Sequence, residues 1–465
     1  MDVLFRSPLG ALLARPWIDG PALFGLARWY FPLSRLWAAA NASAGDVDRF
    51  RDEIGAPLRG AWPRPYLGGL LARHGARQAA AAAARAAWEE ALFDARAGHG
   101  EGGGDGDGGE RRVQLDRRRR SAATRHLSGR AALYPLLFPT RPPPAHWRIE
   151  SPAAAERALA DEIVHPDRLY AAALDLGTVE VSAPIARNGV REIWVRGPSP
   201  AARLHARPGS ERFYARIVEP AGGDAHGTLV FGSGLGLELE LLTLGHDPGA
   251  RLAALGWRVL EPISPYHGLR AMPGFYGGEP FVALAPTAPI DLVAGQTMET
   301  ALLVAWLRAR YGGRVAVAGI SMTSFVAQQA ASRCHLWPAE SRPDAVMLIS
   351  HSGSIGEVTF GGALAVSLGL DRALARAGWS RESLARLAPL VDPTERPAVP
   401  PARIVSVLGV TDRWLPHDDG LAVARAWRLP EENVFRYTLG HLGMPVQLMR
   451  DPAPFERLRR VMEGA

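Results

Sequence analysis

The chain has 465 residues, 47% hydrophobic and 22% charged, with a formal net charge of +6, which is ordinary for a globular protein with room for a large core. Its only cysteine, Cys334, excludes an internal disulfide, and nothing in the sequence points to secretion. No window offers 18 uninterrupted apolar residues, so no membrane span is predicted. We therefore expect a cytoplasmic protein, with peripheral contact at a membrane left open.

Residues 1–95 are predicted to form a helical N-terminal region. The stretch "ARQAAAAAARAAWEEALF" at 76–93 is a strong helix former by propensity alone. Aromatic residues near the start stand among arginines, a pattern of helices that lie on membranes. Packing of these aromatics against the main domain is the favoured alternative. The aromatic residues are Trp17, Phe24, Trp29, Tyr30, Phe31 and Trp37.

The composition changes abruptly after this region. "AGHGEGGGDGDGGERR" is followed closely by "RRRRSAATR", and a glycine-rich tract cannot repay its ordering entropy. We predict a Gly/Arg-rich flexible linker at 96–125 and a connecting helical segment at 126–177. A calcium loop is less favoured because the tract is not repeated, and a phosphate contact because a charge run is usually solvated.

From residue 178 onward, apolar strands alternate with helices. The predicted strands include "GTLVFGSG", "RVLEPISP", "RVAVAGIS", "AVMLISHSG", "RIVSVLGV" and "NVFRYTLG". Fully apolar strands joined by helices predict a mostly parallel sheet covered on both faces. We expect one α/β catalytic domain at 178–465.

The stretch "RVAVAGISMTSFVAQ" places Ser321 between a predicted strand and a predicted helix. This is the context of a nucleophile elbow, whose usual form is G-x-S-x-G. Thr323 occupies the last glycine position, and a β-branched residue disfavours positive φ there. On this motif alone, an elbow and a tight turn with a capping serine are equally good interpretations.

The order of later residues favours the elbow. Asp412 follows the strand "RIVSVLGV", and His441 follows "NVFRYTLG", which is the Ser–Asp–His order of hydrolases on such a sheet. We predict that Ser321 is the nucleophile, His441 the general base and acid, and Asp412 the residue that orients the imidazole. Each residue alone also fits a structural role.

A nucleophile of this kind needs two N–H donors for the oxyanion. We predict the N–H of Met322 as the first donor and that of Ser233 or Gly234, in "GSGLG", as the second. A dinucleotide-binding loop is disfavoured because position 237 is leucine where a third glycine is required.

The stretches "GTLVFGSGLG", "EPISPYHGLR", "GISM", "VTDRWLP" and "GHLG", in that order, resemble the α/β-hydrolase superfamily, and most closely its α/β-hydrolase domain-containing protein 18 group. The resemblance covers roughly residues 225–450. It implies the sheet topology and the same three catalytic positions.

Three further features are ambiguous. Arg270 could bind an acidic substrate group, although a structural ion pair is preferred, and His351 could line the pocket, although a hydrogen-bonded loop histidine is preferred. Residues 355–398 could form a helical lid of two amphipathic helices, or could simply pack on the core.

The leading hypothesis is a serine hydrolase of the esterase or lipase type that cleaves a carboxylic ester, with a lipid ester as one option. No metal, organic cofactor or nucleic-acid partner is expected. Acyl transfer by the same triad, and a catalytically silent hydrolase-like domain that binds a partner, remain the alternatives.

Overall fold

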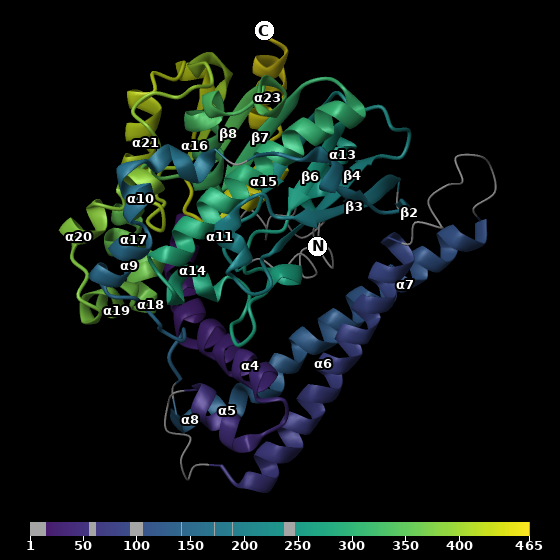
Figure 1. Ribbon diagram of the computed structural model, residues 1–465, viewed down its shortest axis with the longest axis vertical. Coiled ribbons are helices and arrows are strands. Elements are labelled where there is room, and N and C mark those ends of the chain that lie inside the picture. Colours follow the sequence, from purple (N-terminus) through teal and green to yellow (C-terminus); the bar gives the residue numbers. More distant parts are fainter. Residues whose placement is uncertain are drawn as a thin grey trace.

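The computed structural model describes residues 15–54, 62–93, 106–140, 142–171, 173–187, 189–236 and 247–464. Its centre is a ten-stranded mixed sheet with the strand order β1-β3-β4-β6-β5-β7-β8-β9-β10, while β2 pairs with β3 alone (Figure 1). The strands are β1 (Glu180–Val181), β2 (Ile185–Arg187), β3 (Val190–Pro198), β4 (Arg212–Pro220), β5 (Gly227–Gly232), β6 (Trp257–Pro262), β7 (Val315–Ile320), β8 (Ala345–Ile349), β9 (Ile404–Gly409) and β10 (Val434–Tyr437).

The direction of the strands identifies the fold. β4 runs antiparallel to both of its neighbours, β3 and β6, and every pairing from β6 to β10 is parallel. The main path β3-β4-β6-β5-β7-β8-β9-β10, with only its second strand reversed, is the sheet of the α/β-hydrolase fold. The predicted fold class is therefore confirmed.

Helices cover both faces of this sheet, which explains why β7, β8 and β9 are buried along their whole length. On one face lie α15 (Thr287–Tyr311), α16 (Met322–Arg333) and α21 (His417–Ala426), whose apolar side chains share a core with the sheet. On the other face lie α13 (Pro248–Ala254), α22 (Gly443–Arg450) and α23 (Ala453–Glu463). Among the described helices, α15 alone has the length and hydropathy of a membrane span, and that span is wholly buried.

The N-terminal region is helical where it is described. It contains η1 (Pro16–Ile18), α3 (Asp19–Gly25), η2 (Leu26–Tyr30), α4 (Phe31–Ser43), α5 (Val47–Ile54) and α6 (Arg64–Phe93). The long helix α6 pairs with α7 (Gly106–Ser128) in a hairpin that extends away from the sheet (Figure 1).

Helix α7 corrects the prediction of a flexible linker at 96–125. Residues 106–125 are helical, and only 94–105 of the glycine-rich tract lie outside the described residues. Within the arginine run, Arg117 and Arg118 are exposed, whereas Arg119 and Arg120 are buried and paired. Arg120 binds Asp116 at 2.6 Å and Glu192 of β3 at 2.9 Å, and Arg119 lies 4.3 Å from the ring of Trp88. These buried partners replace the solvent that a charge run usually requires.

The connecting segment continues with η3 (Gly129–Leu136) and α8 (Leu137–Thr140), crosses the domain in an extended stretch, and ends with α9 (Pro152–Ala158), α10 (Ala160–Val164), η4 (Pro166–Tyr170) and η5 (Leu176–Thr178). In the extended stretch, the N–H of Arg148 donates to the carbonyl oxygen of Ala283 at 2.9 Å. Ala283 belongs to α14 (Glu279–Ala283), so this stretch lies against one wall of the site described below.

Residues 355–398 form a group of short helices between β8 and β9. They are α17 (Ile355–Gly361), α18 (Ala363–Leu368), α19 (Leu370–Arg376), α20 (Arg381–Ala385) and η9 (Ala388–Leu390). The first of the two predicted amphipathic helices, "GALAVSLGLDRALARAG", is divided because Gly369 adopts φ 83°, a left-handed conformation that glycine tolerates and that ends a helix. The sequence also predicts a helix from "LELELLTL" to Leu255. Residues 237–246 of it lie outside the described residues, and α13 (Pro248–Ala254) occupies its later part.

Candidate active site

The turn between β7 and α16 has the strained geometry of a nucleophile elbow. Ser321 adopts φ 56° and ψ −118°, which is unfavourable for a residue with a Cβ atom and is retained mainly at functional sites. The preceding Gly319 must be a glycine, because a Cβ atom there would lie 2.1 Å from the carbonyl oxygen of Thr323. Helix α16 begins at Met322, so its free N–H groups lie beside the serine.

Thr323 fits this turn despite replacing the usual glycine. Its φ is not positive, because it already belongs to α16, and its Oγ1 both accepts from the N–H and donates to the carbonyl of Ile320 at 3.1 Å. Its bulk occupies the space over Gly232 on β5, where a Cβ atom would lie 2.7 Å from the Thr323 Cβ. Gly232 on the neighbouring strand therefore leaves the space that a glycine at position 323 would otherwise provide.

Three distant residues meet at the carboxyl edge of the sheet. His441 Nε2 lies 2.9 Å from Ser321 Oγ, and His441 Nδ1 lies 2.7 Å from Asp412 Oδ2. These distances fit the tautomer in which Nδ1–H donates to the carboxylate and Nε2 accepts from the serine hydroxyl. Sequence positions 321, 412 and 441 thus form one continuous hydrogen-bonded chain.

Asp412 and His441 are each held from a second side. Asp412 Oδ1 accepts the N–H groups of Trp414 at 2.9 Å and Leu415 at 3.2 Å, which leaves Oδ2 for the imidazole. The Trp414 ring stacks on His441 with 4.9 Å between ring centroids and an interplanar angle of 14°. His441 is 8% exposed and Asp412 5%, so the pair is shielded from water, where such hydrogen bonds are weaker.

A carboxylate from the far N-terminus also reaches this site, and sequence reasoning missed it. Asp19, the first residue of α3, accepts the backbone N–H of His441 at 2.6 Å and that of Leu442 at 3.1 Å. No local sequence signal pairs residues 422 positions apart. The one hint is Gly440, whose role becomes clear only with Asp19 in place.

Of the predicted oxyanion donors, Met322 lines the cavity that contains Ser321, whereas Ser233 lines a neighbouring cavity. Met322 is the first residue of α16 and lines the same cavity as Ser321, together with Leu235 from the loop after β5. Ser233 lines the neighbouring cavity beneath β5, and Gly234 lies between these two residues in the chain. Donation by the N–H of Ser233 or Gly234 stays a prediction.

Protein partners occupy the side chains of Arg270 and His351, which agrees with the structural interpretation preferred for each residue. Both terminal nitrogens of Arg270 bind Glu299 at 2.8 Å and also donate to the carbonyls of Ile263 and Ser210. His351 is fully buried, with Nε2 2.8 Å from Ser406 Oγ, and burial lowers its pKa to about 3. Neither side chain lines the cavity at Ser321.

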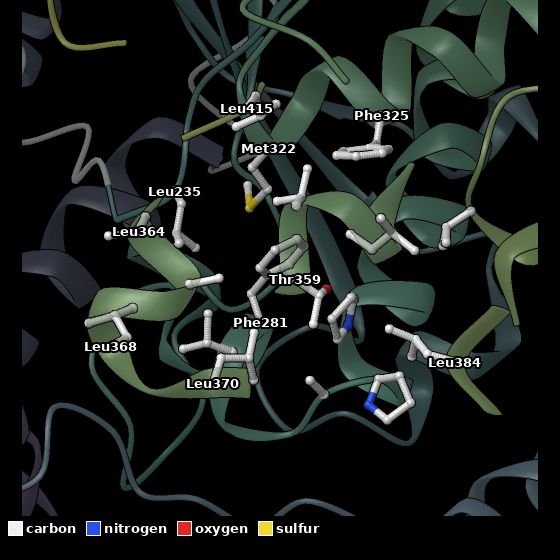
Figure 2. A pocket seen from close by; sticks show the side chains of 18 of the residues that line it. Leu235, Phe281, Met322, Phe325, Thr359, Leu364, Leu368, Leu370, Leu384 and Leu415 are labelled. Carbon is white, nitrogen blue, oxygen red and sulfur yellow. The ribbon is translucent and has the colours of Figure 1, made fainter. Parts of the chain in front are cut away.

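That cavity is almost entirely apolar. Figure 2 shows Met322 and Phe325 of α16, Phe281 of α14 and leucines from α18, α19 and α20 pointing into it. Among the described residues of the lining, Ser321 and Thr359 contribute the only hydroxyl groups. The group of helices at 355–398, proposed as a lid, thus forms much of the wall that faces the serine.

No metal chemistry is suggested by the side chains of this site. Among the residues that the structure describes, no three or more His, Cys, Asp or Glu side chains are grouped as metal ligands. The chemistry available here is that of a hydroxyl nucleophile, an imidazole base and a buried carboxylate.

Comparisons with known proteins reveal distant structural similarity only. No protein-family model matches the chain, and no curated protein matches its sequence. Acetyl xylan esterase 1 from Thermoanaerobacterium sp. is 14% identical, with a TM-score of 0.43 over 65% of this chain and 94% of that one. Brefeldin A esterase, described as a bacterial homologue of human hormone-sensitive lipase, is 17% identical, with a TM-score of 0.39 over 69% and 87%.

A hyperthermophilic esterase from the archaeon Pyrobaculum calidifontis is 15% identical, with a TM-score of 0.38 over 67% of this chain and 93% of that one. These solved structures are esterases of the α/β-hydrolase class. At such identities and scores they carry no argument about this chain, whose fold assignment stands on its own strand order.

Proposed function

We propose that this protein is a serine hydrolase that cleaves a carboxylic ester through an acyl-enzyme formed on Ser321. The observation that carries the proposal is the unbroken hydrogen-bonded chain from Ser321 Oγ through His441 to Asp412, at the base of an apolar cavity. The sequence stretches from "GTLVFGSGLG" to "GHLG" resemble the α/β-hydrolase domain-containing protein 18 group. Placing the chain near that group is part of the proposal.

The reaction then proceeds in two halves. Ser321 Oγ attacks the ester carbonyl carbon while its proton moves to His441 Nε2, and the tetrahedral oxyanion is stabilised by the N–H of Met322 and one from Ser233 or Gly234. The intermediate collapses, and the departing alcohol takes the proton from His441. Water repeats the attack on the acyl-enzyme, giving a carboxylic acid and free Ser321.

The apolar cavity supports an ester with a hydrophobic acyl group as the substrate class. The described part of its lining offers few polar partners to a charged or sugar-like group (Figure 2). Burying each methylene of an acyl chain is worth about 0.8 kcal/mol. A lipid ester is therefore the substrate class that we propose.

A lipid ester would be met at a membrane surface, and the segment beside the cavity suits that contact. Trp17, Phe24 and Trp29 are 58%, 61% and 43% exposed, among the exposed Arg15 and Arg28. Trp17 lies in η1, Phe24 in α3 and Trp29 in η2. Both α3 and η2 pack against α18, which contributes to the cavity wall. Aromatic and basic side chains together favour the interface of an anionic bilayer.

Hydrolysis of p-nitrophenyl esters of graded acyl length tests the proposed activity. Turnover should rise with chain length and disappear in Ser321→Ala. Absence of turnover on every ester would contradict hydrolysis, while ester formation on added alcohol would favour acyl transfer.

Co-sedimentation with anionic vesicles tests the membrane contact. The triple variant Trp17→Ala/Phe24→Ala/Trp29→Ala should lose binding, and Tyr134→Ala, an exposed aromatic on η3, should keep it. Equal binding by both would contradict this contact.

A further inference from the structure

The loop that carries His441 is held by a side chain from the other end of the chain. This loop follows β10, and its backbone N–H groups at His441 and Leu442 both donate to the carboxylate of Asp19, at 2.6 and 3.1 Å. One carboxylate that accepts two adjacent N–H groups fixes the local direction of the backbone, since hydrogen bonds to a charged acceptor are shorter and stronger than neutral ones.

The loop is shaped to receive this carboxylate. A Cβ atom at Gly440 would lie 2.3 Å from Asp19 Oδ2, so any other residue there would displace the carboxylate from both N–H groups. Gly440 does not adopt a positive φ. The close approach of Asp19 therefore accounts for a glycine that backbone conformation does not require.

Asp19 is itself held in place, because the helices after it are anchored in the catalytic domain. Arg35 of α4 is fully buried, donates to the carbonyl oxygen of Gly274 at 2.6 Å and pairs with Glu279 at 3.4 Å. Phe31 packs on Tyr276, with 5.9 Å between ring centroids. Glu279 begins α14, whose Phe281 and Val282 line the cavity. Helix α14 therefore contacts both the N-terminal region and the acyl cavity.

We propose that Asp19 is a positioning residue for catalysis, through which the N-terminal region holds the His441 imidazole in line between Ser321 and Asp412. Asp19 does not touch the reacting atoms, so it acts through the backbone of His441. The inference rests on the proposed function, because it assigns Asp19 a role in that same reaction. Misplacing a catalytic group by about 1 Å can lower the rate by about 100-fold.

The charge of Asp19 gives the proposal a second signature. The titratable groups facing His441 are Asp412 from the loop after β9 and Asp19 from α3, and the Ser321 hydroxyl faces it from the elbow. Burial raises the pKa of the Asp19 carboxyl above its ordinary value, while the N–H groups of His441 and Leu442 oppose that rise. Because this pKa is raised, Asp19 loses its charge at a higher pH than an ordinary aspartate does, and its hold on the two N–H groups then weakens.

The test compares full-length Asp19→Ala and Asp19→Asn with the parent protein. Asp19→Ala should lower kcat on a p-nitrophenyl ester by about 10- to 100-fold, with KM nearly unchanged because the acyl cavity is untouched. Asp19→Asn keeps the shape and one acceptor oxygen but loses the charge. It should lose less activity and shift the acid limb of the kcat–pH profile to lower pH.

Asp46→Asn is the matched control. Asp46 accepts two backbone N–H groups, those of Asp48 at 2.7 Å and Arg49 at 3.1 Å, in the same N-terminal region and without contact to the site. It should leave kcat and the pH profile unchanged. Unchanged kcat and pH profile in both Asp19 variants, or equal losses in Asp46→Asn, would overturn the inference. If the parent protein itself hydrolyses no ester and reacts with no fluorophosphonate, the proposed function fails instead.

Discussion

The carboxyl edge of the sheet and the N-terminal helical region reach the same imidazole by different routes. The sheet supplies Ser321 and Asp412 after the buried strands β7 and β9, and His441 after the partly exposed strand β10. The N-terminal region supplies Asp19, which contacts only the backbone of that histidine. The proposed catalytic side chains thus lie where fold and sequence pattern agree, whereas the contact from Asp19 is created only by the tertiary structure.

Substituting His441 or Asp412, the residues supplied by the sheet, should have the largest effect on turnover. His441→Ala should lower kcat by about 10⁶-fold and Asp412→Asn by about 10⁴-fold, the sizes seen when members of such triads are lost. Because neither change removes core packing, circular dichroism should be unchanged. Ester turnover near the parent rate in either variant would remove that residue from the mechanism.

Narrowing the cavity should have the next largest effect on kcat/KM, and the loss should depend on the length of the acyl chain. Ala365 of α18 lines the cavity, whereas Val366 on the same helix is 39% exposed. Ala365→Phe should exclude about four methylenes of a long chain, a loss of about 100-fold in kcat/KM, while leaving acetate esters unaffected. Val366→Phe is the control and should change neither. A uniform loss across chain lengths would show that the acyl chain lies elsewhere.

The fit of Thr323 over Gly232 can be tested by a double-mutant cycle. Gly232→Ala places a Cβ atom 2.7 Å from that of Thr323 and should cost about 1–3 kcal/mol of unfolding free energy, as overpacking usually does. The same change made in Thr323→Gly should cost much less, which measures the contact directly. Equal costs in both backgrounds, from urea unfolding, would mean that Thr323 does not compensate for the missing elbow glycine.

The smallest effect expected is on acid stability in the N-terminal region. Burial lowers the pKa of His74 and of His126 to about 4, so the unfolded chain binds more protons between pH 6.5 and 4. Their contribution to stability is present above pH 6.5 and is lost as the pH falls toward 4. Glu279 acts oppositely, because burial raises its pKa to about 7.

His126→Gln should therefore flatten the fall of the urea midpoint between pH 6.5 and 4, and the exposed His335→Gln should not. Identical pH slopes for the two variants would show that His126 is not the acid-sensitive group.

Much of the catalytic domain could be predicted from sequence because its signals are local. Apolar strands ended by glycine, followed by Ser321, Asp412 and His441 in a fixed order, predict both the sheet and the site. The order in α7 could not be predicted in the same way, because Arg119 and Arg120 are stabilised by Trp88 and by Glu192, a residue of β3. A structural ion pair was the preferred interpretation of Arg270, but the sequence could not name its partner, because Glu299 lies on a separate helix.

The most direct test of the central claim is to locate a fluorophosphonate label on the intact protein by peptide mass spectrometry at neutral pH. We predict stoichiometric modification of Ser321, greatly slowed in His441→Ala and absent in Ser321→Ala. An unlabelled parent protein, or a label on any other residue with Ser321 unmodified, would contradict the account.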